Sequence, residues 1–564
     1  MHNRANVRLW SAAVVVAGVV ALGGCRDNPL AVSNPNNPNV AQVYGTPKDV
    51  ETIISKIFQQ MWDAQQGNPA VGNIGVGVQT MVMSFESHSG LANFGMGSRA
   101  SIPRNPVSND LGNSDQAIIF NDFDRLTRNS RSAANAIAAM DRFVAAGGGT
   151  GSAAEDARDR SFAYFNLGYG LGNIALLYDS AAIITPAVPS DVIPPLSTSK
   201  AVMDVALTFL DSALVISQSA AATSGANGWP IPTAWVSGGA AGSADVPIAL
   251  WQQIIHSYKA RFRAGNARTP ADHAAVDWNA VVNDATAGIT SDFVVTASSS
   301  GGWGAVWLDQ MAVDATWSQM TPFILGMADT TGGYDAWLAT ALNSRAPFLL
   351  GTPDKRFPAG ATRALQTAVT GNSHAGTAAG SILYFRNRPA GDDKPAAPWG
   401  NWYYDNWRFW SVNQGGGNGP VMAFSQVEND MLAAEGYIRT ARVALAIPLI
   451  NRTRVRAGLA AIPAGAAATD QVPGATGCVP RVPQPPNFTS TACGTVYEAM
   501  KWEKRVETSF TGYAQWFLDS RGWGDLTEGT VLEWPVPWEE LYARQNLTIY
   551  TTSNSRAAKG TYGF

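Results

Sequence analysis

The stretch Gln426–Leu459 reads QVENDMLAAEGYIRTARVALAIPLINRTRVRAGL and decides the fold class. Its apolar residues recur at helical spacing, which predicts two consecutive helices over 425–440 and 441–457. Pro448 lies within the second pattern. Because proline lacks an amide donor and crowds the preceding turn, we expect it to kink or interrupt that helix. A pair of helices joined by a turn is the unit that tetratricopeptide-like folds stack.

Helical patterns of the same kind occur along most of the chain. The clearest begins at Thr46, a good N-cap, with Pro47 at the first helical position and Asp49 completing a capping-box pattern. No clean repeat consensus recurs, so the repeats are degenerate. The sequence therefore predicts a mainly all-α scaffold of tetratricopeptide-like helix pairs. The other expected helices cover 122–144, 155–167, 199–217, 248–263 and 279–289.

The N-terminus has the layout of a secretory signal. Arg4 and Arg8 precede an apolar run over 12–22. That run has about 11 residues, whereas a membrane-spanning helix needs about 20, so it is expected to be cleaved. The residues that follow, up to Cys25, resemble the bacterial lipobox. Residues 1–24 are thus expected to be a lipoprotein signal peptide, and Cys25 the lipid anchor. A chance cysteine after an ordinary signal peptide is the alternative.

The chain after Cys25 divides into three expected regions. Residues 25–45 are polar and rich in Asn and Pro, which is typical of an extended, flexible tether. An N-terminal helical region is expected over 46–292. A C-terminal region over 293–564 is expected to pack with it as one globular unit. After Cys25, no stretch of the sequence is long and apolar enough to span a membrane.

Aromatic residues gather in a loop-rich part of the sequence, from about 293 to 420. Flat apolar faces of a ligand stack on exposed rings, so these residues are candidates for a binding surface. Phe85, His88 and Phe94 lie in another irregular stretch that is also expected to reach such a surface. Core packing is the competing interpretation of every ring. The candidates in the aromatic-rich region are Trp303, Trp307, Trp317, Tyr334, Trp337, Trp402, Tyr403 and Tyr404.

The sequence contains little catalytic or metal-binding patterning. None of its five histidines forms a zinc-binding motif, and no phosphate-binding P-loop is present. The glycine run at 168–172 is too loose for a dinucleotide fingerprint, and Gly371–Ala375 lacks the last glycine of a nucleophile elbow. Asp392-Asp393 is interpreted as a solvated loop rather than a calcium site. The net charge of −4 gives no indication of nucleic-acid binding. No cofactor and no metal are expected.

Cys478 and Cys493 are an isolated pair of cysteines in a chain expected to be exported. Such a pair predicts a disulfide, and two free thiols are the alternative. The bridge would close a loop of about 15 residues, which contributes roughly 3 kcal/mol in the chain-entropy model.

Several motifs together resemble the SusD/RagB family of surface lipoproteins. The strongest match is Gln426–Leu459, which follows the family pattern "E…L-x-AEA … IN-x-x-R-x-RAGL" with Gly436 in place of the last Ala. The weaker matches are Arg160–Leu167 with Tyr169-Gly170, Pro353–Arg356, Glu503–Gly524 and Pro535–Leu541. Thr511, Ala514 and Phe517 stand where the family tends to carry Glu, Arg and Asp, so we expect packing in place of the family's local polar network.

The resemblance implies an all-α, tetratricopeptide-like scaffold with an irregular ligand-binding part. It also implies a partner, a SusC-like TonB-dependent outer-membrane channel, over which the protein sits on the extracellular side. Proteins of this family hold a nutrient, usually an oligosaccharide and in some members a peptide, and they are not enzymes. Two other functions compete with this one. A surface glycoside hydrolase needs two facing carboxylates, and a tetratricopeptide-type scaffold binds only proteins.

Overall fold

The computed structural model describes residues 43–67, 74–89, 93–113, 115–223, 229–239, 244–313, 319–370, 382–390, 402–546 and 555–564. The signal peptide, Cys25 and the tether up to residue 42 lie outside the described residues. So do Trp317, the Gly371–Ala375 stretch and Asp392-Asp393.

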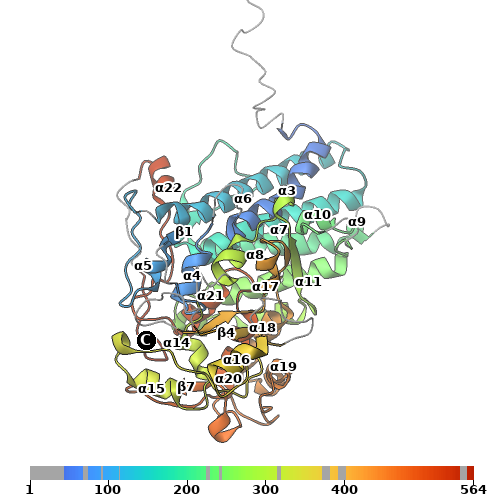
Figure 1. Cartoon of the computed structure of the whole chain (residues 1–564). Helices are drawn as coiled ribbons and strands as arrows, with labels where there is room; N and C mark the ends of the chain where they lie inside the picture. The colour runs from blue at the N-terminus through green and yellow to red at the C-terminus, as the bar shows by residue number, and fades with distance from the viewer. Residues whose placement is uncertain are drawn as a thin grey trace, which may run out of the picture.

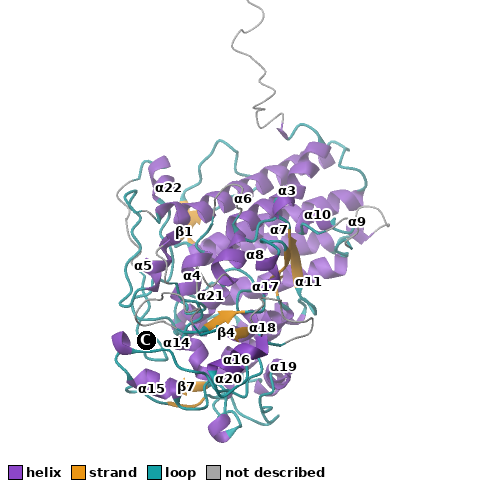
Figure 2. Cartoon of the chain, in the orientation of Figure 1, coloured by secondary structure: helices purple, strands orange, loops and turns teal. Residues whose placement is uncertain are grey.

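Long helices form one part of the molecule, and short helices, short strands and loops form the other. The long helices lie in the upper half of Figure 1, and the irregular part lies below them. Figure 2 shows that helices dominate and that strands are few and short, which confirms the predicted mainly α fold. The long helices are α3 (Pro47–Gln66), α6 (Gln116–Ala145), α7 (Ala153–Leu177), α8 (Ser199–Ser217) and α11 (Ile248–Gly265).

Local sequence sets the ends of these helices. The Thr46 hydroxyl accepts a hydrogen bond from the Asp49 amide at 3.2 Å, which caps α3 as predicted. The bounds of α8 agree with the predicted 199–217. By contrast, the prediction for α7 stopped at Leu167, ten residues before the helix ends at Leu177. Those ten residues begin with the glycine run at 168–172.

The glycine run keeps α7 in close contact with the helices around it. A Cβ on Gly168 would lie 2.8 Å from the Ala206 carbonyl oxygen of α8. One on Gly172 would lie 2.2 Å from the Phe262 ring of α11. Each glycine destabilises an isolated helix by about 1 kcal/mol, which is why the sequence pattern predicts that this helix ends at Leu167. Burial of α7 among its neighbours outweighs that cost.

The pair of helices predicted from 425–457 is present as α18 (Gln426–Arg439) and α19 (Val443–Arg456). Of the two effects expected of Pro448, an interruption is wrong, because α19 continues through it, and a kink stays a prediction. Pro448 and Ala444 are both exposed, so the carbonyl that loses its helical donor can bond to water. The remaining helices of nine or more residues are α13 (Trp278–Thr286), α20 (Val496–Thr508) and α21 (Gln515–Trp523).

Short helices make up much of the irregular part. The α-helices are α4 (Gly77–Met83), α5 (Met96–Ala100), α9 (Ala220–Thr223), α10 (Thr233–Val236), α12 (Pro270–Ala274), α14 (Pro322–Leu325), α15 (Gly333–Ala339), α16 (Arg363–Thr370), α17 (Trp410–Gln414) and α22 (Trp538–Ala543). The other helical turns are η1 (Asn93–Gly95), η2 (Ser299–Gly301), η3 (Trp307–Val313), η4 (Gly326–Ala328), η5 (Leu342–Ser344) and η6 (Ala475–Gly477).

The strands described form two-stranded antiparallel ribbons. In the longest, Val295 pairs with Val421. The ribbons are β1 (Ser180–Ala182) with β2 (Leu196–Thr198), β3 (Phe293–Ala297) with β6 (Gly419–Phe424), β4 (Phe385–Asn387) with β5 (Tyr404–Asn406), and β7 (Arg481–Pro483) with β8 (Thr491–Cys493).

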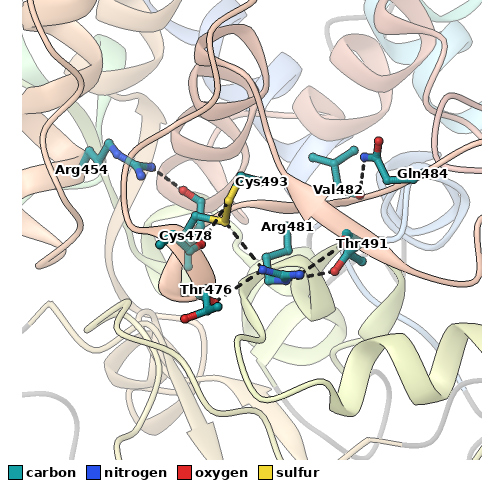
Figure 3. Close-up of a disulfide and its surroundings, with 10 residues drawn as sticks. Arg454, Thr476, Cys478, Arg481, Val482, Gln484, Thr491 and Cys493 are labelled. Atoms are coloured by element: carbon teal, nitrogen blue, oxygen red, sulfur yellow. Dashed lines mark hydrogen bonds between the residues drawn. A yellow bond between two sulfur atoms is a disulfide. The ribbon is translucent and has the colours of Figure 1, made fainter.

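The β7–β8 ribbon carries the disulfide that the sequence predicts. Cys478 and Cys493 are bonded, with their Cα atoms 5.7 Å apart (Figure 3). Arg481 lies across the same ribbon and donates to the Thr491 hydroxyl at 3.0 Å and to the Thr491 carbonyl at 3.1 Å. The Arg454 guanidinium donates to the Val479 carbonyl at 2.6 Å, which ties the ribbon to α19.

One continuous hydrophobic core contains residues from both ends of the chain, from Val50 to Tyr562. The Trp62 indole of α3, for example, donates to the Gly304 carbonyl at 2.7 Å. Within the described part of the chain, no helix combines the length and the apolar character that crossing a membrane requires.

A buried ion network joins the motifs on which the family resemblance rests. The Arg356 guanidinium contacts Asp354 at 2.7 Å, Glu503 at 2.8 Å and Glu507 at 3.1 Å, and these four side chains are buried. Asp354 and Arg356 come from the Pro353–Arg356 turn, whereas both glutamates project from α20. The two motifs therefore contact each other through charged groups.

Near Thr511, Ala514 and Phe517 we expect packing in place of a polar network, but the structure has both. The Phe517 ring does pack, with its centroid 5.5 Å from that of Trp534. A polar network is nevertheless present beside it, because α20 and α21 supply other charged groups. Lys504 is fully buried and lies 2.7 Å from the Asp519 carboxylate.

Candidate functional site

Five of the predicted site residues belong to one series of ring contacts, which also includes Phe323 and Phe348. We call these seven residues the aromatic cluster. Ring centroids are 5.9 Å apart between Tyr334 and Trp337, and 4.6 Å apart between Trp402 and Tyr404. Phe348 links the two pairs, at 6.2 Å from Tyr334 and 5.3 Å from Trp402. The five predicted members are Tyr334, Trp337, Trp402, Tyr403 and Tyr404. All are buried except Tyr403, which is half-buried.

Two other predicted tryptophans lie in different parts of the core. The Trp303 ring packs against α3, with its centroid 6.1 Å from that of Phe58. The Trp307 ring lies 6.1 Å from Phe510. Both tryptophans are buried, and Trp317 lies outside the described residues. The structure therefore does not gather Trp303 and Trp307 with the aromatic cluster.

The stretch that contains His88 reaches the aromatic cluster from the N-terminal half. His88 pairs with Gln319 as an antiparallel bridge, in which its amide donates to the Gln319 carbonyl at 2.6 Å. Phe94 is half-buried, and its carbonyl accepts from the Gln79 amide group at 3.3 Å. Phe85, three residues before His88, makes the closest contact with the cluster: its ring stacks on Phe323 with centroids 4.1 Å apart.

A cavity of about 320 Å³, which we call the pocket, opens beside these rings. Phe323 of α14 and Phe564 contribute rings to its wall. The Phe564 centroid lies 5.0 Å from Phe323 and 5.3 Å from Phe85, edge to face in both pairs. Figure 1 shows the C-terminal end of the chain beside α14. The described lining residues are Ile102, Pro103, Phe323, Leu342, Arg345, Thr527, Glu528, Lys559, Gly563 and Phe564.

Charged side chains surround the mouth of the pocket. Arg345 is half-buried and lies 4.1 Å above the Trp337 ring. Its guanidinium donates to the Thr340 carbonyl at 3.0 Å and to the Leu338 carbonyl at 3.2 Å, which fixes its position. Glu528 and Lys559 are exposed. The pocket thus combines apolar ring surface with a carboxylate, an ammonium and a guanidinium.

The groups behind the pocket are mostly uncharged at neutral pH. Burial raises the pKa of Glu86 to about 8, although the Phe510 amide donates to its carboxylate at 2.6 Å. Burial, and then the charge of Arg104, lower the pKa of His88 to about 4. Burial, and then Arg99, lower the pKa of Arg104 to about 9, which leaves it protonated. Its guanidinium lies 5.1 Å from the Phe85 ring and donates to Thr527 at 3.4 Å.

This arrangement suits the binding of a flat, hydroxylated molecule. Ring faces accept the apolar side of such a ligand, and charged rim groups form hydrogen bonds with hydroxyls. Across the described residues, no group of three or more His, Cys, Asp or Glu side chains is placed to hold a metal ion. Nine of the ten ligand-binding residues nominated from the sequence are described by the structure, and none of these nine is among the described residues that line the pocket.

The fold is shared with solved structures of one superfamily. A SusD superfamily protein from Bacteroides vulgatus superposes with a TM-score of 0.50 at 11% identity, over 85% of this chain and 89% of that one. The chain has the SusD fold. A SusD homologue from Parabacteroides distasonis also superposes with a TM-score of 0.50, at 13% identity over 84% of each chain. The predicted resemblance to SusD/RagB proteins is therefore confirmed at the level of the fold.

Sequence comparison alone does not detect this relationship. No protein-family model matches the chain, and no curated protein is similar to it in sequence. The motifs that suggested the SusD fold are short, and Arg356, Glu503 and Glu507 in them are buried, so they report on packing of the fold.

Proposed function

We propose that this protein is a non-catalytic surface lipoprotein that captures an oligosaccharide and delivers it to a TonB-dependent outer-membrane transporter. The observation that carries the proposal is the pocket, where the half-buried ring of Phe564, backed by the buried ring of Phe323, meets the charged groups of Glu528 and Lys559. Sugar rings present C–H faces that stack on aromatic rings and hydroxyls that need polar partners. The SusD fold and the lipobox-like sequence ending at Cys25 support the same reading.

The composition of the pocket favours binding over hydrolysis. Glycoside hydrolases need two carboxyl groups on either side of the scissile bond. The described lining contains one, that of Glu528. Among the described lining residues, a ligand that enters the pocket therefore meets hydrogen-bonding groups without a carboxylate pair.

A binding screen with a parallel assay of hydrolysis tests this proposal. The mature chain is titrated calorimetrically with neutral and acidic oligosaccharides and with short peptides, while release of reducing sugar is measured in the same mixtures. We expect saturable binding of an oligosaccharide and no release. Release of reducing ends that disappears when one acidic residue is replaced would establish the hydrolase instead.

The membrane part of the proposal has its own test. Wild-type protein is expected to partition with outer membranes and to co-purify with a channel-like membrane protein. Cys25→Ser protein is expected in the soluble fraction, because it cannot receive the lipid. A Cys25→Ser protein that still partitions with membranes would contradict the lipid anchor.

A further inference from the structure

Two adjoining cavities lie along α6. Figure 1 shows α6 well away from α14, the helix that contributes Phe323 to the pocket. The first has a volume of about 680 Å³ and lies between Gln60 of α3 and the outer face of α6. The second, of about 460 Å³, lies between α6, the segment that contains Val192 and Ile193, and α22. Both cavities are lined by Arg128 and Ser132, so they adjoin at these two residues, and we call the two cavities together the α6 groove. Among the described residues, none lines both the α6 groove and the pocket.

Three arginines follow the α6 groove at intervals of three residues: Arg125, Arg128 and Arg131. Three residues of α-helix rise by about 4.5 Å, which is comparable with the length of one linked sugar ring. The Arg128 side chain is 76% exposed, so its guanidinium is accessible. Arg131 donates to the carbonyls of Val188 at 3.0 Å and Val192 at 3.3 Å, which holds it in the groove wall.

The lining of the α6 groove is positively charged, although the whole chain has a net charge of −4. Arg544 of α22 adds a fourth guanidinium to the three of α6, whereas the described lining contributes only two carboxylates, Asp124 and Glu540. Asp124 pairs with Arg128 and Glu540 with Arg544, each at 2.7 Å. Guanidinium groups therefore outnumber carboxylates by four to two among the described lining residues, which favours an anionic ligand.

Uncharged groups in the α6 groove are typical of saccharide recognition. Phe120 is half-buried and contributes a ring to the lining. Asn121 and Asn129 line the same cavity, and backbone carbonyls fix their amide groups: Asn121 donates to Ala64 at 3.2 Å and Asn129 to Arg125 at 2.9 Å. Amides held in this way offer hydroxyl groups a rigid set of polar partners.

From these contacts we infer that the α6 groove is a second ligand site, which binds an acidic oligosaccharide through its carboxylate or sulfate groups. The inference rests on the proposed function only in that the ligand is a saccharide. Guanidinium groups bind carboxylates and sulfates with two parallel hydrogen bonds, and several neighbouring arginines engage successive charged rings of one chain. Phe120 and the two asparagines bind the uncharged parts of the same rings.

The test is a calorimetric titration of the full mature chain with tetragalacturonate, its fully methyl-esterified form and a sulfated tetrasaccharide. We expect at least one of the two acidic probes to bind. The neutral ester should bind at least about tenfold more weakly than tetragalacturonate if the latter binds. Affinity for the acidic probe should fall between about 50 and 300 mM salt, because salt screens exposed charges.

Matched variants separate the α6 groove from general charge effects and from the pocket. R125Q/R128Q should lower the affinity for the acidic probe at least about tenfold. Arg142 is an exposed arginine of α6 that lines neither cavity, so Arg142→Gln should change the affinity less than about twofold. Melting curves of all variants check that they remain folded.

Three results would overturn the inference. One is that R125Q/R128Q binds the acidic probes as wild type does. Another is that neither acidic probe binds, including the case in which the arginines bind only vesicles of anionic phospholipid. The third is that Phe564→Ala abolishes binding of acidic saccharides while R125Q/R128Q does not. That result would support the proposed function of the pocket and contradict the second site. If no saccharide binds, neutral or acidic, both the proposed function and the second site are contradicted.

Discussion

The rings of Phe85 and Phe323 lie face to face, with centroids 4.1 Å apart and planes 3° apart. Phe85 has a φ of 61°, a left-handed conformation that costs a residue with a side chain roughly 1–2 kcal/mol. Such conformations persist where the surrounding structure determines them, and they are concentrated at functional sites. The contact joins the N-terminal half of the chain to α14 directly beside the pocket. The wall of the pocket is therefore assembled by tertiary packing.

The first prediction concerns the close packing of α7. Gly172→Ala would place a Cβ 2.2 Å from the Phe262 ring. We expect a loss of about 1–3 kcal/mol in the free energy of unfolding, because overpacking a core forces side chains out of their preferred positions. Urea denaturation measures the change. Gly148→Ala is the control, since its nearest atom would be 3.7 Å away, and an equal effect in both variants would refute the packing role.

The second prediction concerns the buried ion network. Arg356→Met leaves Asp354, Glu503 and Glu507 together without the cation that contacts all three. We expect the free energy of unfolding to fall by about 3–5 kcal/mol, because uncompensated buried charge is costly. Denaturant titration gives the value.

A surface arginine provides the control for that measurement. Arg142→Met removes an exposed guanidinium, and we expect a change within about 0.5 kcal/mol. If Arg356→Met were as stable as this control, the network would not hold the two motifs together.

The third prediction is a pH dependence set by Glu86. Its pKa rises from 4.5 to about 8 on folding, so the folded state keeps a proton that the unfolded state has lost. The resulting stabilisation is complete below pH 4.5 and is lost as the pH rises through 8. Glu86→Gln cannot titrate, so its stability relative to wild type should improve across this window by up to about 1.4 kcal/mol per pH unit.

Urea denaturation at several pH values between about 5 and 8.5 compares Glu86→Gln with wild type over that window. Glu528→Gln, which removes an exposed carboxylate, is the matched control. A difference between Glu86→Gln and wild type that stays constant with pH would show that Glu86 does not bind a proton on folding.

The fourth prediction concerns the disulfide. Replacing both Cys478 and Cys493 by Ser should lower the free energy of unfolding by about 3 kcal/mol, because the open loop gains conformational entropy in the unfolded chain. A reducing agent should lower the melting temperature of wild type toward that of the double variant and leave the variant unchanged. Equal melting temperatures of wild type with and without reductant would contradict the prediction.

Local patterning was sufficient to predict several of the long helices, although it did not predict α20 or α21. Caps and apolar spacing gave α3, α8 and the α18–α19 pair, because these features act over a few residues. The end of α7 was missed for the opposite reason. Glycines weaken an isolated helix, and only contacts with α6, α8 and α11 make them favourable inside α7.

The candidate site was harder to predict than the fold. Ring type and loop context nominated Trp337 and Tyr404, which the structure buries, because large aromatic rings serve the core as readily as a surface. The pocket itself is lined by residues such as Ile102, Phe323 and Phe564, which are distant in sequence. No local signal marks them as neighbours, although Phe85 was already grouped with His88 as a stretch able to reach a site.

The central claim is that the pocket binds saccharide, and a titration of pocket variants tests it most directly. The neutral oligosaccharide that binds wild type most tightly is titrated into Phe564→Ala and Lys559→Gln. Phe143→Ala, another half-buried ring, and Lys200→Gln, another exposed lysine, are the matched controls. We predict that Phe564→Ala weakens binding at least about tenfold and Lys559→Gln several-fold, with both controls unchanged. Unchanged affinity in both pocket variants, with all four proteins folded, would contradict the claim.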